Sequence, residues 1–214
     1  PATFTGGVIV DNKSTPPHLY IADSLNNRIL CYDDVRRVRP GDKADLIIGQ
    51  ETEFESKVNA PNNDENAPTQ TGVFRPTGLA LDNIGNLYVA DSGNGRVLRF
   101  PAPFSQGGKK LQPANLVLGQ TGFTFKTTDI TRNTMRLPIG LAFTVQGDLA
   151  VSDAFHHRVL LFRKDPTPGS DFTTGMPATI VFGRPAFDDR AFDDDANRLD
   201  TPHHIAIDSS NRLY

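Results

Sequence analysis

Two pairs of adjacent histidines are the side chains of this sequence best suited to metal binding or proton transfer. They are His156 with His157 and His203 with His204. Imidazole is a common Zn²⁺ ligand, and it changes its charge near neutral pH. If the fold places both pairs on one surface, four rings become available to a metal ion or to a proton. The sequence therefore predicts a candidate zinc or proton-transfer site at these four residues.

A second group of candidate ligands is acidic. It lies in the segment AFDDRAFDDDANRLD, residues 186–200, and its densest part is Asp193, Asp194 and Asp195. Carboxylates at short spacing can bind Ca²⁺. However, the segment lacks the alternating D-x-D-x-D-G spacing of a calcium loop. A calcium-binding loop and a solvated acidic loop are the two interpretations, and the spacing favours the second.

A third polar pattern is an aspartate followed five residues later by an arginine. It occurs in LYIADSLNNRILCY, LYVADSGNGRVLRF and LAVSDAFHHRVLLF, as the pairs Asp23–Arg28, Asp91–Arg96 and Asp153–Arg158. A hairpin would place each aspartate opposite its arginine, and a guanidinium can bind both a carboxylate and nearby carbonyl oxygens. A catalytic site rarely recurs in every repeat of a chain. We therefore interpret the three pairs as structural.

Each pair belongs to a longer repeated unit. An apolar segment such as GLALD (78–82) precedes it, and a second one such as NLVLGQ (115–120) follows it. Asn- and Gly-rich turns separate these short runs, and no segment has convincing helical periodicity. Each unit therefore reads as four antiparallel strands, and their repetition predicts an all-β fold, a β-propeller of four-stranded blades. We expect residues 1–214 to form a partial β-propeller, with blade 1 at about 5–50, blade 2 at about 75–120, blade 3 at about 137–184 and the start of a fourth blade at 201–214.

Three stretches resemble the repeats of the NHL-repeat proteins, in a long bacterial variant. They are PPHLYIADSLNNRILCY, PTGLALDNIGNLYVADSGNGRVLRF and PIGLAFTVQGDLAVSDAFHHRVLLF. The resemblance implies a six-bladed ring, of which about three and a half blades are visible, so that further blades or a second copy would have to close it. It also implies an extracellular or periplasmic location. In amidating lyases of the family, zinc-binding histidines stand at inner-strand starts, which is the expected position of His203 or His204.

Three long connections fall on one face of such a propeller, because strands alternate in direction. They cover residues 51–72, 121–136 and 185–200. Long loops on a rigid scaffold are a usual place for ligand binding. The alternative is that these loops only cap the blades, with Phe54, Phe123 and Phe187 buried beneath them. With their flanking residues the connections carry a net charge of −4, which disfavours nucleic acid as a partner.

Composition narrows the remaining classes of function. The 214 residues include 22 basic and 25 acidic side chains, a net charge of −3, and one cysteine, so an intrachain disulfide framework and a Cys-based zinc site are excluded. No apolar run has the length of a membrane span. We therefore favour a non-enzymatic NHL-type scaffold that binds a protein, peptide or glycan partner through its inter-blade loops. The alternative is a secreted lyase or hydrolase whose histidine-based metal site is completed by blades outside this sequence.

Overall fold

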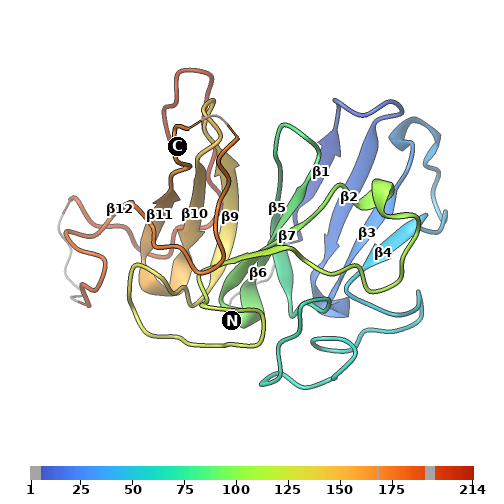
Figure 1. Cartoon of the computed structure of the whole chain (residues 1–214), viewed down its shortest axis with the longest axis horizontal. Coiled ribbons are helices and arrows are strands. Elements are labelled where there is room, and N and C mark those ends of the chain that lie inside the picture. Colours follow the sequence, from blue (N-terminus) through green and yellow to red (C-terminus); the bar gives the residue numbers. More distant parts are fainter. Residues whose placement is uncertain (1–5, 168, 191–195) are drawn as a thin grey trace.

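The computed structural model describes residues 6–167, 169–190 and 196–214, and the structural statements below apply to these residues. Their strands form three four-stranded antiparallel sheets. Figure 1 shows the sheets as three separate groups, coloured blue, green and yellow to orange. Within each sheet the strands follow one another in sequence order. The fold is therefore all-β, a partial β-propeller in which each sheet is one blade.

The strand bounds are as follows. Blade 1 consists of β1 (Val8–Asp11), β2 (His18–Asp23), β3 (Arg28–Tyr32) and β4 (Leu46–Ile48). Blade 2 consists of β5 (Pro76–Leu81), β6 (Leu87–Asp91), β7 (Arg96–Phe100) and β8 (Leu116–Leu118). Blade 3 consists of β9 (Pro138–Phe143), β10 (Leu149–Asp153), β11 (Arg158–Phe162) and β12 (Ile180–Phe182). Short 3-10 helices are η1 (Ser24–Asn26), η2 (Val35–Arg37), η3 (Ser92–Asn94), η4 (Pro103–Gln106) and η5 (Ala154–His156).

The turn between the second and third strands has the same backbone in every blade. It is one 3-10 turn that ends in a left-handed residue, with φ of 51° at Asn27, 62° at Gly95 and 53° at His157. Glycine and asparagine adopt this conformation at low cost. At Gly95 an added Cβ would also lie 2.4 Å from the Met135 carbonyl oxygen. The turn therefore sets the position of every side chain on it relative to the hairpin.

Apolar side chains fill the junctions between neighbouring blades. Tyr20 and Ile29 of blade 1 share one cluster with Val89 and Phe100 of blade 2, and a second cluster joins blades 2 and 3. Every residue of β6 and β7 is buried, because blade 2 has a neighbour on both sides. This double burial explains why the inner strands carry consecutive apolar residues instead of a strict alternation.

The first strands of successive blades approach each other through a repeated glycine. A Cβ added at Gly78 would lie 2.1 Å from the Ile139 carbonyl oxygen, and one added at Gly140 would lie 2.5 Å from that of His203. A serine hydroxyl also crosses each of these junctions, since Ser92 Oγ donates to Pro138 O at 2.5 Å. The close approach depends on the missing side chain, because a Cβ there would overlap backbone atoms. It fixes the register of one blade on the next.

Residues 201–214 pack against blade 3 without forming a regular strand. They contain one isolated antiparallel bridge, between Ile207 and Leu213, and the Ala206 and Tyr214 backbones exchange two hydrogen bonds. Ile205 also packs against the apolar cluster on the outer side of blade 3. At the expected start of a fourth blade the structure thus has a bridge with flanking hydrogen bonds, and its assignment to a fourth blade stays a prediction.

The two faces of the molecule carry different connections. The loop face carries the 3-10 turns that follow β2, β6 and β10 together with the three long connections, some of which are seen toward the bottom of Figure 1. The opposite face carries the turns between the first and second strands and the links between the third and fourth. No helix of the described residues is long and apolar enough to cross a membrane.

The three phenylalanines that follow the fourth strands do not behave alike. Phe123 and Phe187 are half-buried against the inter-blade clusters, but Phe54 is 86% exposed, so its expected burial is wrong. Phe123 packs at the junction of blade 2 with the blade before it. The described residues contain no blade before blade 1, and the Phe54 ring therefore lies outside, 5.6 Å from Lys43 Nζ.

Candidate functional site

Each aspartate–arginine pair is an ion pair across a hairpin. The strand register places each aspartate directly opposite its arginine, in the pairs Asp23–Arg28, Asp91–Arg96 and Asp153–Arg158. The distance from arginine Nε to aspartate Oδ2 is 2.7 Å in blades 1 and 2 and 3.1 Å in blade 3. Both side chains are fully buried in blades 2 and 3, whereas those of Arg28 and Asp23 are 18% and 23% exposed.

The arginines also hold the long connections of the loop face. Arg96 Nη2 donates to Thr69 O at 2.9 Å and to Gly72 O at 3.2 Å, in the connection before its blade. Its Nη1 donates to Phe123 O, in the connection after the blade. Arg158 repeats this arrangement with Thr134 O and Phe187 O. These guanidinium groups therefore bind backbone carbonyls in addition to their aspartates, and the structural role of the pairs stays a prediction.

A glutamine clamp that the sequence analysis missed closes the start of two connections. Gln50 Nε2 donates to Asn27 O and Lys57 O, both at 2.8 Å, and its Oε1 accepts from the Lys57 N–H. Gln120 makes the equivalent bonds with Thr127, which lies seven residues further along the chain than Gln120. The repeated Gly-Gln at the end of the fourth strand was the available signal. In blade 3 Arg184 stands at this position, and its Nε donates to His157 O at 3.3 Å.

His156 takes a place that asparagine has in the other blades. Its Nδ1 lies 2.8 Å from Asp153 Oδ2, as Asn94 Nδ2 lies 2.8 Å from Asp91 Oδ2. Its Nε2 lies 3.2 Å from Thr128 O. Burial raises the pKa of Asp153, but the hydrogen bond and charge of His156, the charge of Arg158 and a backbone N–H together lower that pKa below its ordinary value. His156 thus stabilises the turn and its buried carboxylate.

His157 takes the place of a second asparagine. In blade 1 the Arg75 N–H donates to Asn27 Oδ1 at 3.0 Å, and in blade 3 the Thr201 N–H lies 3.1 Å from His157 Nδ1. The same ring nitrogen lies 2.8 Å from Asp200 Oδ1, and the protonation of the ring decides which contact is the hydrogen bond. His157 therefore connects its turn to the segment that follows.

The second histidine pair lies apart from these contacts. The backbone carbonyl of His203 accepts from Ser152 Oγ at 2.5 Å, and its side chain is exposed. His204 lines a 410 Å³ hollow beside Val159 and Phe182, not the pocket of His156 and His157. Within the described residues no three His, Cys, Asp or Glu side chains form a group that could hold a metal ion. The histidine-based metal site stays a prediction.

The acidic segment is only partly described. Asp193, Asp194 and Asp195, the predicted cation loop, lie outside the described residues. Asp189, which precedes them, pairs with Arg198 and lies 3.8 Å from Arg184 Nη1. This part of the segment therefore has arginine partners. A calcium loop at Asp193–Asp195 stays a prediction.

A 230 Å³ pocket lies on the loop face beside the η5 turn of blade 3. Its lining includes Ile130, Arg136, Phe155 and Arg190 in addition to the two histidines. Phe155 is 51% exposed, and the Arg136 guanidinium lies 4.8 Å from its ring centroid, which is a cation–π contact. An aromatic ring and an arginine thus stand together at the mouth of the pocket.

These two residues do not follow the repeat. The position of Phe155 is Leu25 in blade 1 and Gly93 in blade 2, and in blade 2 the Phe74 ring covers the glycine, where an added Cβ would lie 2.4 Å from it. Phe74 and Arg136 occupy the same place, since the N–H of each donates to the aspartate of its blade. In blade 3 an arginine therefore stands at the position of Phe74 and the aromatic ring stands on the turn at the position of Gly93, and both line the pocket.

A second and larger hollow, of 520 Å³, lies on the opposite face between blades 2 and 3. It is lined by the β5–β6 turn, the β9–β10 turn and the link between β11 and β12. Its buried arginine, Arg99, was not among the sequence-based candidates. The signal was present, because the equivalent positions are Cys31 in blade 1 and Leu161 in blade 3.

Comparison with known proteins agrees with this architecture. The family model of the NHL repeat matches residues 75–100. A virginiamycin B lyase from Staphylococcus aureus has a similar fold, with a TM-score of 0.51 and 16% identity over 99% of this chain and 49% of that one. A streptogramin B lyase aligns with a TM-score of 0.47 and 14% identity over 100% of this chain and 53% of that one. The chain thus spans about half the length of these structures. No curated protein matches it.

The repeated four-stranded blades define the class of protein, a β-propeller of which this chain forms part. Residues 75–100, which include β5, β6 and β7, are an NHL repeat. The resemblance noted in the sequence is thereby confirmed.

Proposed function

We propose that this NHL-type propeller is a non-enzymatic scaffold that binds a protein partner through the loop face of blade 3, by accepting a peptide segment in the 230 Å³ pocket. The observation that carries the proposal is the Arg136–Phe155 pair at the pocket mouth. Arginine and aromatic side chains are the types that most often dominate the binding energy of protein interfaces.

The repeated residues of the loop face support the proposal because they fix the loops and leave contact with a ligand to the unrepeated residues. Arg96 and Arg158 hold the connections on both sides of their blades, and Gln120 closes one of them. A surface whose loops are already fixed loses little conformational entropy when a ligand binds, so the free-energy cost of binding is smaller. Recognition then falls to residues that differ between blades, such as Phe155.

The chemistry of the pocket indicates a peptide with a carboxylate beside an apolar side chain. Arg136 and Arg190 are exposed at the rim, and the nearly buried Ile130 forms an apolar part of the wall. An arginine binds a carboxylate with two parallel hydrogen bonds, and a phenyl ring adds apolar contact area. The acid can be an Asp or Glu side chain or the terminal carboxylate of the partner.

Selection from a displayed random-peptide library tests the proposal. We expect enriched peptides to contain an acidic residue next to an apolar one, and we expect Phe155→Ala and Arg136→Ala each to weaken the selected peptide about tenfold or more. Leu25→Ala is the matched control, because Leu25 has the same position in blade 1 and is 76% exposed. Equal losses in all three variants, or retained binding in the first two, would contradict the proposal.

A further inference from the structure

We propose that the 520 Å³ hollow on the opposite face, between blades 2 and 3, is a binding site for a neutral saccharide. Its volume lies within the range of about 300–1,000 Å³ that is usual for small-molecule sites. The hollow is separate from the loop-face pocket, and none of its lining residues belongs to that pocket. This site is therefore independent of the proposed peptide binding.

The hollow exists where blade 2 departs from the repeat. At the junction of blades 1 and 2, Phe104 from the β7–β8 link packs over Tyr20, 6.0 Å between ring centroids, next to the buried Cys31. At the junction of blades 2 and 3, Phe172 lies 6.3 Å from Tyr88 in the same way, but Arg99 replaces the cysteine. A charged side chain at an otherwise apolar position needs polar partners, and these partners line the hollow.

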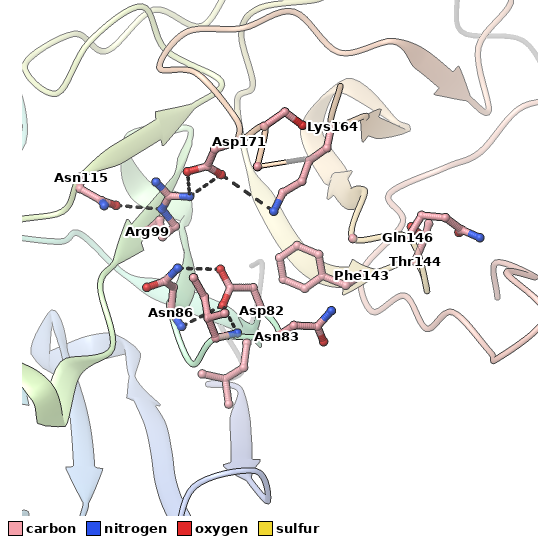
Figure 2. A pocket seen from close by; sticks show the side chains of 15 residues that line it. Asp82, Asn83, Asn86, Arg99, Asn115, Phe143, Thr144, Gln146, Lys164 and Asp171 are labelled. Carbon is pink, nitrogen blue, oxygen red and sulfur yellow. Dashed lines mark hydrogen bonds and ion pairs between the residues drawn. The ribbon is translucent and has the colours of Figure 1, made fainter. Parts of the chain in front are cut away.

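Arg99 forms a rigid polar floor. Its Nη1 donates to both oxygens of Asp171 at 2.7 Å and lies 3.3 Å from the Tyr88 hydroxyl, and its Nε donates to Asn115 Oδ1 at 2.8 Å. Figure 2 shows the contacts of Arg99 with Asp171 and Asn115, with Lys164 reaching the same Asp171 carboxylate. Burial raises the pKa of Asp171, but hydrogen bonds from Arg99 and from the Phe172 N–H lower it below its ordinary value. The floor therefore holds a compensated charge pair.

The ionisable side chains of the lining carry no net charge. Two carboxylates, Asp82 and Asp171, balance two cations, Arg99 and Lys164. The remaining polar side chains are mostly carboxamides and hydroxyls; they are Asn83, Asn86, Asn115, Gln146, Thr144 and Ser170. A carboxamide both donates and accepts hydrogen bonds, as a sugar hydroxyl does. A charged ligand would find no excess of opposite charge here, whereas a ring with several hydroxyls would find matching partners.

An apolar surface completes the lining. Phe143 lies beside the hollow, held edge-on against Tyr88 at 5.0 Å between centroids, and Ile84 is 79% exposed at the rim. The C–H face of a pyranose ring can pack on such a surface while its hydroxyls reach the amides. The equivalent of Phe143 in blade 2 is Leu81, so the aromatic ring is another departure from the repeat.

Titration calorimetry with defined oligosaccharides tests this assignment. Cellohexaose, maltohexaose and N-acetylchitohexaose serve as neutral probes, and hexagalacturonate serves as the anionic probe. We expect at least one neutral probe to bind, with a Kd that changes less than about twofold between about 50 and 500 mM NaCl, because no net charge is screened. Binding only of hexagalacturonate, or no binding of any probe, would overturn the assignment.

Three variants locate the binding. Asn83→Ala should raise the Kd of the neutral probe about tenfold by removing a hydrogen-bonding amide, and Phe143→Leu, which restores the residue of blade 2, should raise it about fivefold. Asn12→Ala is the control, because Asn12 has the position of Asn83 in blade 1 and does not line the hollow. A loss in Asn12→Ala equal to that in Asn83→Ala would place the saccharide elsewhere and overturn the assignment.

Discussion

Blade 1 and blade 2 have the same framework, yet they differ in what surrounds it. Both contain the aspartate–arginine pair, the glutamine clamp and a buried tyrosine in the second strand. The pair of blade 2 is fully buried between two neighbouring blades, whereas that of blade 1 is partly exposed. At one position of the third strand, Cys31 of blade 1 becomes Arg99 in blade 2.

The comparison separates two kinds of residue. Where the blades agree, the side chains bind backbone carbonyls of the adjoining turns and loops, and we predict a structural role for them. Their energetic contribution depends on burial, because water weakens an exposed ion pair. Where one blade departs from the others, as at Arg99 and Phe155, a hollow or pocket lies beside the departure. In a repeat protein, the unrepeated residues are therefore the better candidates for function.

The largest expected effect concerns the arginine of the pair. Arg96→Ala should lower the free energy of unfolding by about 3–5 kcal/mol, because it leaves Asp91 buried without its counter-charge and releases two connections. Arg28→Ala should lower it by about 1 kcal/mol or less, because the pair of blade 1 is partly exposed. Urea unfolding followed by circular dichroism measures both. Equal losses would show that burial does not set the difference between the blades.

The ion pair of blade 3 extends the comparison to the stability of the protein at acidic pH. Asp153 has a pKa below its ordinary value, so its contribution to stability is complete above the unfolded-state pKa of about 3.9 and is lost as pH falls through the lower folded-state pKa. Asp153→Asn should therefore cost about 3 kcal/mol at pH 7, where the wild-type carboxylate is ionised. The deficit should shrink below about pH 4. Urea midpoints at several pH values would show a constant deficit if Asp153 were not the titrating group.

A smaller effect is expected at the glutamine clamp. Gln50→Ala and Gln120→Ala should each cost about 1–3 kcal/mol, because backbone groups that are bonded to the buried amide lose their partner. Both side chains belong to residues that are 1% exposed, so the two losses should be equal within about 0.5 kcal/mol. Gln146→Ala, at an exposed glutamine, serves as the control. A negligible loss at Gln50 or Gln120 would mean that the clamp does not stabilise its connection.

The smallest effect on stability is expected where the two blades differ. Arg99→Leu introduces the residue type of blade 3 at this position, and loss of an ion pair whose acidic partner is about half exposed costs little. We expect a change within about 1 kcal/mol by urea unfolding, since Asp171 is 47% exposed on its side chain and can be hydrated. A loss above about 3 kcal/mol would make Arg99 a framework residue rather than part of a site.

Local sequence patterns were sufficient for the hairpins of the fold. The runs LYVAD and RVLRF correspond to β6 and β7, and Asp91 lies opposite Arg96, because a short turn fixes the register. Residues that act across long sequence distances were not predictable in this way. The hollow beside Arg99 depends on Asp171, 72 residues away. The expected burial of Phe54 was wrong because Phe54 would need a blade that precedes blade 1 to pack against, and the described residues contain none.

The histidines show the limit of reasoning from residue type alone. Their chemistry suggested a metal, but His156 and His157 stand at positions of asparagines and bind equivalent partners. Aligning the three turns with one another would have shown this equivalence. The same alignment shows that Phe155 is the one aromatic residue at its position in the turn, which is Leu25 in blade 1 and Gly93 in blade 2.

Amide hydrogen–deuterium exchange with the selected peptide is the most direct test of the proposed function. We predict slower exchange on peptide addition in residues 128–136 and 154–157, which form the pocket of the loop face, and unchanged exchange in the equivalent turn of blade 1, residues 24–27. Protection confined to residues 82–86 and 143–147 of the opposite face, or equal protection of the turns of blades 1 and 3, would contradict the account.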